Sequence, residues 1–384
     1  ALISNAGTTS SAVANPDGSP SEQRSLTQLS AGRDIQLGVV GIESSSQLNY
    51  AARQMSGNDS TRQTQDIGGQ IQSQGDVQLI AKQDISTRAA NIQTDGRLQV
   101  QAARDIRIES GQVSFEHSEA RDIRQRGTLS SSRTITQNSD ASTSAVGSSL
   151  GGNTVVLNAG NNLTVKGSEV ISDQSTALVA GNNINIETAQ HTQTSEPFQS
   201  TQKSGVMSGG GVGVSVGKRQ QSTDTQQQSI THSGSTIGAI EGNLTLVAGN
   251  QASIQGSTLV TPGGDIAVLA QNIAITEVQN THSSQTETKA KQSGLTVSLG
   301  NAVISAAQTT QGMAQAAGQT SSTRMQALAG ASAGLNLVNN AGDISKAAQN
   351  PVGNTSLSIS LGSSKSQSSS TSTGSIAQGS SLSA

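Results

Sequence analysis

The chain has no cysteine and no tryptophan, and its 384 residues include only one tyrosine, two phenylalanines and five prolines. Without cysteine it can form neither a disulfide framework nor thiolate metal sites. No run of about 18 apolar residues occurs, which excludes a conventional membrane-spanning helix. Charged residues make up 12% of the chain and the net charge is -3. This composition gives no electrostatic reason to expect nucleic acid or an anionic membrane as a partner.

A short phrase of alternating apolar residues recurs along the chain. In "ALVAGNNINIE" at 177–187, Leu178, Ile184 and Ile186 flank the Ala180-Gly181 step at alternate positions. Comparable phrases surround Ala31, Ala81, Ala102, Ala159, Ala248 and, more loosely, Ala270. An alternation of two is typical of strands and not of helices. The recurring unit is therefore predicted to be built from strands.

The spacing of these phrases predicts the architecture. Ala81 and Ala102 lie 21 residues apart, and so do Ala159 and Ala180. A fixed period of this length indicates a solenoid. Three short strands with sharp corners use about 21 residues, so we expect an all-β fold: a right-handed parallel β-helix of about 21-residue coils. Because each coil contacts only its neighbours, residues 1–384 are predicted to form one elongated unit.

Glycine and asparagine follow the central alanine in several copies. We expect Gly160, Gly181 and Gly249 to supply the positive φ angles that a sharp corner needs. Stacked coils place like residues above one another, so Asn162 and Asn183 are predicted to form an amide ladder. These five residues are therefore assigned structural roles in turns and ladders.

Two aspartates occupy the equivalent corner position in earlier copies. Asp84 and Asp105 would repel each other if stacked directly. Arg104 and Lys82 are adjacent in sequence and are expected to offset this repulsion. Bound calcium is the less favoured alternative.

Long polar excursions separate the coils. They span about 44–73, 115–152, 190–240 and 279–380. We interpret each as an outgoing strand, a tip and a returning strand. The last two are candidate interaction hairpins, and their alternating apolar residues are Val212, Val214, Val216, Leu357, Ile359 and Leu361.

The fourth excursion carries an alanine-rich insertion at about 300–354. Ala, Gln, Met and Leu favour helix, and the apolar spacing is near 3.6, so a small helical insertion is predicted. The alternative is a disordered loop, given the serine and glycine content of the segment.

Candidate catalytic groups are few. His117, His191, His232 and His282 lie in or at the base of the excursions, and none has metal-ligand spacing to another. A polysaccharide-acting β-helix enzyme, the alternative function, would need paired carboxylates or a basic cluster with aromatics that stack on sugars. Three aromatic residues argue against it. We therefore expect no enzyme activity and no catalytic, cofactor-binding or metal-ligating residues.

The repeats and excursions together resemble a known family. "AGNNLTVKGSEV", "AGNNINIE" and "SAGRDIQL", combined with excursions carrying "KSGV" or "QSGLTVSLG", are similar to the later haemagglutinin-repeat region of filamentous haemagglutinins and contact-dependent growth inhibition exoproteins. The similarity covers nearly the whole chain. It implies a secreted protein on the surface of a Gram-negative bacterium, exported by an outer-membrane two-partner secretion transporter.

The resemblance also implies the partners. Members act as adhesins or deliver a C-terminal toxin into neighbouring cells, so the expected partner is a target-cell outer membrane or a host surface. A toxin domain is expected beyond the C-terminal end of this segment. The sequence does not separate the adhesin from the delivery branch.

Overall fold

A computed structural model of the chain describes residues 2–5, 25–208, 213–300 and 356–384. All regular elements in these ranges are β-strands. Apart from Gly300, the predicted helical insertion at 300–354 lies outside the described residues, and so does Val212.

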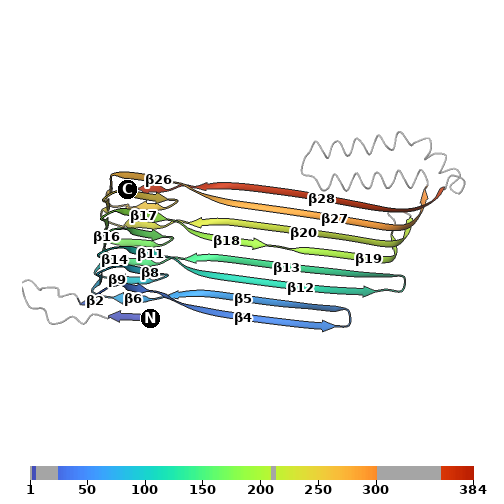
Figure 1. Ribbon diagram of the computed structural model, residues 1–384, viewed down its shortest axis with the longest axis horizontal. Helices are drawn as coiled ribbons and strands as arrows, with labels where there is room; N and C mark the ends of the chain where they lie inside the picture. The colour runs from blue at the N-terminus through green and yellow to red at the C-terminus, as the bar shows by residue number, and fades with distance from the viewer. Residues whose placement is uncertain (1, 6–24, 209–212, 301–355) are drawn as a thin grey trace, which may run out of the picture.

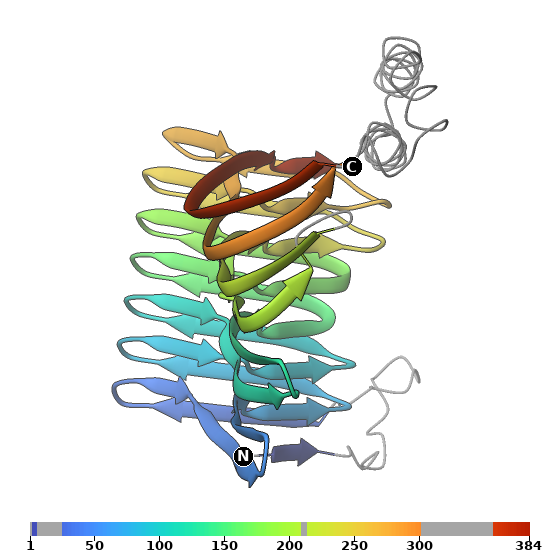
Figure 2. The same cartoon turned by 90° about the vertical axis from the view of Figure 1, so that its right-hand side faces the viewer.

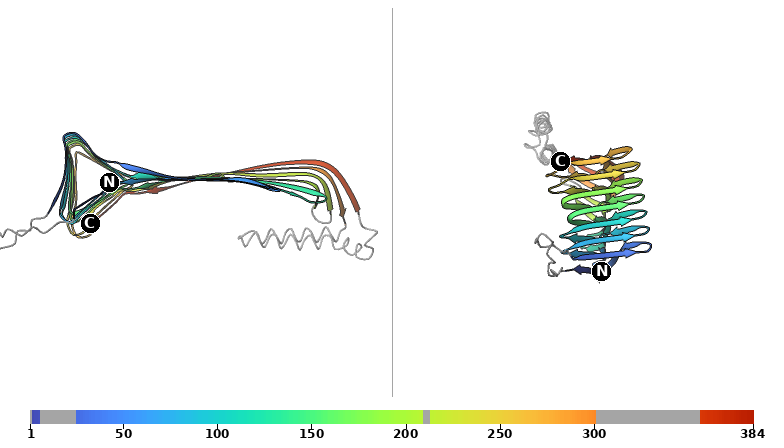
Figure 3. Two further views of the ribbon diagram at one scale, coloured as in Figure 1. Left: turned by 90° about the horizontal axis from the view of Figure 1, so that it is seen from below. Right: turned by 90° about the vertical axis from the view of Figure 1, so that its left-hand side faces the viewer.

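Short parallel strands stack into three faces around a triangular cross-section (Figure 3). The chain runs from face 2 to face 3, then to face 1, and back to face 2. Face 1 contains β1 (Leu2–Asn5), β6 (Gln70–Ser73), β9 (Asn91–Thr94), β14 (Ser149–Ala159), β16 (Glu169–Ala180), β21 (Thr236–Ala239), β24 (Thr258–Val260) and β29 (Ser381–Ser383). Face 2 contains β2 (Leu26–Ala31), β7 (Asp76–Ala81), β10 (Arg97–Ala102), the ends of β14 and β16, β22 (Leu244–Ala248) and β25 (Ile266–Leu269). Face 3 contains β3 (Ile35–Leu37), β8 (Ile85–Arg88), β11 (Ile106–Glu109), β15 (Leu163–Lys166), β17 (Asn183–Glu187), β23 (Gln251–Gln255) and β26 (Asn272–Thr276).

The register of face 2 follows the sequence phrases. Ala81 pairs with Ala102, which pairs with Ala159, and Ala159 pairs with Ala180. Like residues therefore stack on like residues in parallel strands, which is the arrangement of a β-helix. The all-β prediction with parallel stacking is confirmed.

The alternating apolar residues fill the interior of the stack. At most 1% of each of the following residues is exposed: Leu98, Val100, Ile106, Ile108, Val155, Leu157, Leu163, Val165, Ile184, Ile186, Leu244 and Leu246. They belong to one continuous core cluster. Full burial of a leucine or isoleucine side chain contributes about 1.5–3 kcal/mol, so this narrow core is the main stabilising element of the coils.

A second sheet of long antiparallel strands projects from one corner of the stack (Figures 1 and 2). We call it the hairpin sheet. Its strands are β4 (Val39–Ala52), β5 (Met55–Gly68), β12 (Gly111–Arg126), β13 (Ser130–Val146), β18 (Ala189–Ser195), β19 (Phe198–Ser208), β20 (Gly213–Ser233), β27 (Val278–Gly300) and β28 (Ser356–Gln378). Three of the predicted excursions begin after the first residue of their hairpin and run into the next face-1 strand, namely 44–73, 115–152 and 190–240. Their composition does not change at that point, because the returning strand enters the coil directly.

Candidate interaction surface

The hairpins leave the stack from every second coil. The step from face 3 to face 1 is short after β8, β15 and β23, and carries a hairpin after β3, β11, β17 and β26. Neighbouring strands in a sheet lie about 4.8 Å apart, so the two strands of one hairpin occupy the height of two coils. This match lets successive hairpins pair edge to edge, as β5 does with β12 and β20 does with β27.

The short corners use residues with positive φ. Gly167 and Gly256 both have φ of 52°, and Ala89 takes φ of 47° at the equivalent corner. Glycine adopts this left-handed region at little cost, whereas alanine does so at some strain. The chain can therefore turn from face 3 to face 1 without a hairpin.

A ladder of serines ties these corners together, and the sequence analysis did not identify it. The backbone N–H of Ser148 donates to Ser168 Oγ (3.1 Å), that of Ser168 to Ser235 Oγ (3.3 Å), and that of Ser235 to Ser257 Oγ (3.1 Å). The last rung runs from Ser257 N–H to Ser380 Oγ (3.3 Å). The first four serines are at most 4% exposed. A Gly-Ser pair at each step was the available signal, and the ladder fixes the corner from which the hairpins arise.

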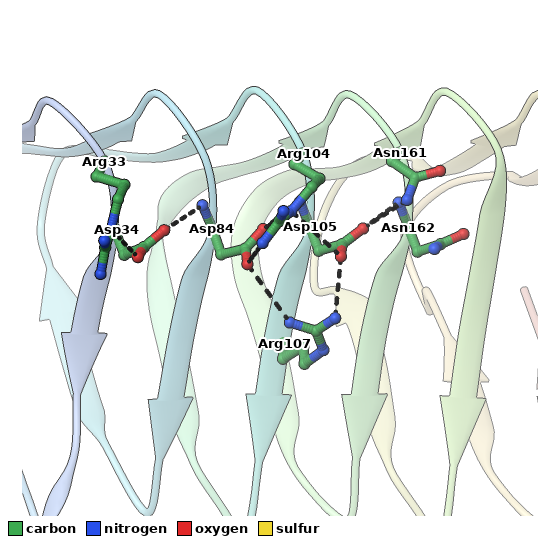
Figure 4. A network of polar contacts seen from close by, with 8 residues as sticks. All are labelled: Arg33, Asp34, Asp84, Arg104, Asp105, Arg107, Asn161 and Asn162. Carbon is green, nitrogen blue, oxygen red and sulfur yellow. Dashed lines mark hydrogen bonds and ion pairs between the residues drawn. The ribbon is translucent and has the colours of Figure 1, made fainter.

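The opposite end of face 3 carries a ladder of aspartates and asparagines (Figure 4). Asp34 Oδ1 accepts the N–H of Asp84 (3.2 Å), and Asp84 Oδ1 accepts the N–H of Asp105 (3.2 Å). Asp105 Oδ1 then accepts the N–H of Asn162 (3.1 Å) and the side-chain amide of Asn161 (2.8 Å). Each side chain thus satisfies a backbone donor of the following coil.

Arginines neutralise the stacked carboxylates (Figure 4). Arg104 Nε donates a hydrogen bond to Asp84 (2.7 Å). Arg107 forms an ion pair with Asp105 (2.9 Å) and lies 3.9 Å from the Asp84 carboxylate. The hydrogen bond from Arg104 holds the pKa of Asp84 below its usual value. The predicted role of Arg104 is confirmed, and Arg107 is the second cation at this pair, where Lys82 was expected. Within the described ranges, no group of three or more His, Cys, Asp or Glu side chains could hold a metal ion.

Gly160, Gly181 and Gly249 lie at the predicted corner, but the reason given for them was wrong. None of the three has positive φ. Instead, a Cβ at Gly160 would lie 2.2 Å from the Ala103 oxygen, and a Cβ at Gly181 or Gly249 would lie 2.1 Å from the glycine oxygen of the preceding coil. Close approach of backbones, and not a left-handed turn, explains these glycines.

The asparagine ladder is staggered relative to the prediction. The side-chain amide of Asn182 donates to Asn162 (3.2 Å) and lies 3.4 Å from Asn161 Oδ1, whereas that of Asn250 donates to Asn183 (2.9 Å). The bonds therefore link each coil to the next through adjacent asparagines. Asn162 and Asn183 both accept from this ladder.

The hairpin sheet aligns apolar residues of its outer part in two rows. Val206, Val216, Leu295 and Leu361 form the first row, and Val214, Val297 and Ile359 form the second. Val214 and Val216 are each 51% exposed and Leu361 is 83% exposed, while Ser215 between the valines is buried. The candidate residues of the third excursion, on β20, and of the fourth, on β28, thus lie in the same rows, and residues of β27 lie between them. Leu357 pairs with Leu299 in the same ladder.

A row of glycines crosses the same strands just inside the apolar rows. Gly205, Gly217, Gly294 and Gly362 are direct partners on β19, β20, β27 and β28. A Cβ at Gly217 would lie 2.1 Å from the Ser293 oxygen. The row lies in the outer part of the strands, and Figure 3 shows the sheet bending toward its outer end. Glycine permits the close backbone approach that this part of the sheet requires.

A basic groove crosses the sheet inside the glycine row. Its volume is about 1080 Å³, and nine basic residues but no acidic residue line it. These residues are Arg53, Arg124, Arg126, Arg133, Lys203, Lys218, Arg219, Lys291 and Lys365. Two of the nine, Lys203 and Arg219, pair with each other in the row between the remaining ones, so their side chains point to the opposite face of the sheet. The sequence analysis missed this groove because its residues are scattered over six strands and one turn. The available signal was a basic residue within three positions of each glycine of the row.

One acidic residue partly offsets this charge from outside the groove. Asp122 accepts hydrogen bonds from Arg133 (2.8 Å) and Arg124 (3.0 Å). These bonds lower the pKa of Asp122 to about 2. The two arginines at one end therefore share one carboxylate, which offsets one of their two positive charges. Lys218, Lys291 and Lys365 carry no ion pair within the described part of the chain.

The histidines occupy ordinary structural positions on the hairpin sheet. His117 Nδ1 lies 3.3 Å from Thr61 Oγ1, His191 Nδ1 accepts the N–H of Ala145 (3.2 Å), and His232 Nδ1 lies 3.0 Å from Asn280 Oδ1. These partners are hydroxyl, amide and backbone groups, and one carboxylate oxygen, Asp59 Oδ1, lies 3.7 Å from His117 Nδ1. The polysaccharide-acting alternative gains no support from them.

The described ranges contain no candidate for a membrane-spanning helix.

Comparison with known proteins places the chain in one family. The profile of the family described as Hemagglutinin repeat matches residues 50–132 and 128–294. A 16S rRNA endonuclease CdiA of Enterobacter cloacae is 34% identical over 328 residues, covering 83% of this chain and 10% of that protein. A Toxin CdiA of Yersinia pestis is 37% identical over 227 residues, covering 58% of this chain and 7% of that protein.

A third relative, a Deoxyribonuclease CdiA of Yersinia pseudotuberculosis, is 38% identical over 208 residues, covering 53% of this chain and 19% of that protein. The chain thus spans a fifth or less of the length of these relatives. No solved structure matches it. The chain belongs to the haemagglutinin-repeat family and corresponds to the repeat region that it shares with contact-dependent growth inhibition proteins.

Proposed function

We propose that this chain is the part of a secreted toxin-delivery protein that associates with the envelope of a neighbouring bacterium. The parent protein would lie on the surface of a Gram-negative cell, exported by an outer-membrane two-partner transporter, with a toxin domain C-terminal to this segment. Residues 1–384 would act as one right-handed β-helical unit within it. The CdiA relatives support this assignment.

The names of the relatives favour delivery over nuclease activity for this region. Proteins called a 16S rRNA endonuclease, a tRNA nuclease and a Deoxyribonuclease share it at 34–38% identity. A segment common to proteins with different nucleic-acid substrates is a poor candidate for the site that selects among them. We infer that the segment serves a step that all of them need, namely reaching and crossing the target envelope.

The hairpin sheet is the single observation that carries the proposal. The coil surface repeats from one coil to the next, whereas the sheet projects from one corner and has a distinct outer part (Figure 1). Its outer part combines exposed apolar rows with a basic groove. Exposed apolar side chains beside a charged region mark interaction sites in soluble proteins.

Shortening the third hairpin tests this role. Residues 198–224 would be replaced by Asn-Gly in the full-length protein, which removes β19 and half of β20 but keeps the pairing of β18 with the rest of β20. We expect the β-helix to stay folded by circular dichroism and toxin delivery to be lost. The control changes exposed residues of the first hairpin that lie outside the groove, S44A/S46A/Q47A, and should retain most delivery. Normal delivery after the 198–224 replacement would contradict the proposal.

A further inference from the structure

The basic groove has two walls formed by successive rows of the hairpin sheet. Residues on adjacent strands that pair directly point to the same face, and so do residues two apart along one strand. Lys291 pairs with Lys365 in the inner wall. Gln220 pairs with Lys291 and so belongs to the same inner wall. Lys218 lies two positions nearer the tip than Gln220 on the same strand, and it stands in the outer wall together with Arg126.

The same face continues directly into the apolar rows. Along β20 the order is Lys218, Val216 and Val214, and along β28 it is Lys365, Ser363 and Leu361. Residues two apart on a strand are separated by about 6.8 Å. The cationic groups and the apolar side chains therefore lie within one or two side-chain widths of each other on an open face.

Three of the cations in the groove have no counterpart within the described part of the protein. Lys218, Lys291 and Lys365 are exposed and form no ion pair there, although the whole chain has a net charge of -3. Concentrated positive charge without internal partners attracts phosphate groups, with which ammonium and guanidinium groups form charge-assisted hydrogen bonds. The composition had given no reason to expect an anionic partner, since net charge does not report how charge is distributed.

We propose that the groove binds the phosphate groups of anionic lipid headgroups. The adjoining face, formed by Val214, Val216 and Leu361, contacts the acyl region of the lipids. This proposal deepens the proposed function, because it assigns a ligand chemistry to the same surface. Lipid is favoured over nucleic acid for a specific reason. Single-stranded nucleic acid is held by aromatic stacking, and none of the residues lining the groove is aromatic.

Vesicle binding by the whole 384-residue chain tests the proposal. Vesicles of phosphatidylcholine alone are compared with vesicles containing 30% phosphatidylglycerol at low salt, and bound protein is measured by co-sedimentation. We expect binding only to the anionic vesicles, weakening as salt rises because screening reduces the attraction. A basic residue near an anionic surface contributes about 5-fold in affinity, so K218Q/K291Q/K365Q should bind roughly 100-fold more weakly.

A variant with the same charge change elsewhere is the control. K82Q/R97Q/K166Q removes three cations from the coils and should bind within about 3-fold of the parent, since none of these residues lines the groove. In a second arm, V216S/L361S should weaken binding to anionic vesicles but leave the affinity for soluble tripolyphosphate unchanged. This arm separates the lipid source of phosphate from free phosphate.

Several results would overturn the proposal. Equal binding to both vesicle types would do so, as would equal loss in the two triple variants. Tight binding of single-stranded RNA without vesicle binding would assign the groove to nucleic acid instead. If the 198–224 replacement abolishes delivery while K218Q/K291Q/K365Q binds vesicles like the parent, the lipid assignment fails and the proposed function stands.

Discussion

Replacing Ser235 with alanine tests the serine ladder at the base of the hairpins. Ser235 is fully buried. Its Oγ accepts the Ser168 N–H and donates to the Glu187 oxygen (2.7 Å). The Glu187 oxygen keeps a second donor, the N–H of Gly167 (3.0 Å), so only the Ser168 N–H loses its acceptor.

The magnitude follows from these contacts. A buried donor left without a partner costs about 1–3 kcal/mol, and the lost hydroxyl bond adds about 1 kcal/mol, so the total lies near 2–4 kcal/mol. Ser253 on face 3 is half-buried, and Ser253→Ala is the matched control, expected to change stability by less than about 0.5 kcal/mol. Urea unfolding followed by circular dichroism measures the loss, and amide exchange at Ser168 locates it. Equal stability of the two variants would refute the ladder as a stabilising element.

Two further predictions concern the coil core and the charged edge of the groove. Leu163→Ala should lower the free energy of unfolding by about 2–5 kcal/mol, because Leu163 is fully buried between its neighbours in face 3. Urea unfolding measures this loss, and a change below about 1 kcal/mol would contradict the core assignment. Asp122, with a pKa near 2, should contribute stability that is present above its ordinary pKa and is lost as the pH falls from about 4 to about 2. Arg133→Gln should raise that pKa toward its ordinary value, as followed by carboxyl carbon NMR, and an unchanged titration would exclude Arg133 as the cause.

The coils were predictable because their signal is local. Leu163 and Ile184 occupy the same place in successive phrases, and the structure pairs them directly. A strand buried on one face needs alternation of two, and a stack needs a fixed period, so both requirements are written in short stretches. The burial of these residues follows from the pattern alone.

The hairpin sheet was only partly predictable because its pairing is not local. Val216 and Leu361 share a row only through Leu295 of β27, from another part of the chain. The alternation indicated strands but not their order in the sheet. The role of Gly181 was also misjudged, since a sequence shows that a side chain is absent but not whether φ or a neighbouring oxygen requires it.

The groove could not be read from composition. Arg53 and Lys365 lie more than 300 positions apart in the sequence, and apart from Lys218 and Arg219 no two of the basic groove residues are adjacent in sequence. Only the cross-strand register brings Lys291 beside Lys365. A charge cluster formed in this way is visible once the ladder is known.

The match between hairpins and coils constrains how such a protein can change its length by gene duplication or deletion. Two strands and two coils share about 9.6 Å of stack height, so a whole unit of two coils and one hairpin can be gained or lost without disturbing either ladder. Insertion of one coil without a hairpin would separate β13 from β18 and β19 by an extra strand width and leave their backbone groups unpaired. We therefore expect length variants of this region to differ by pairs of coils.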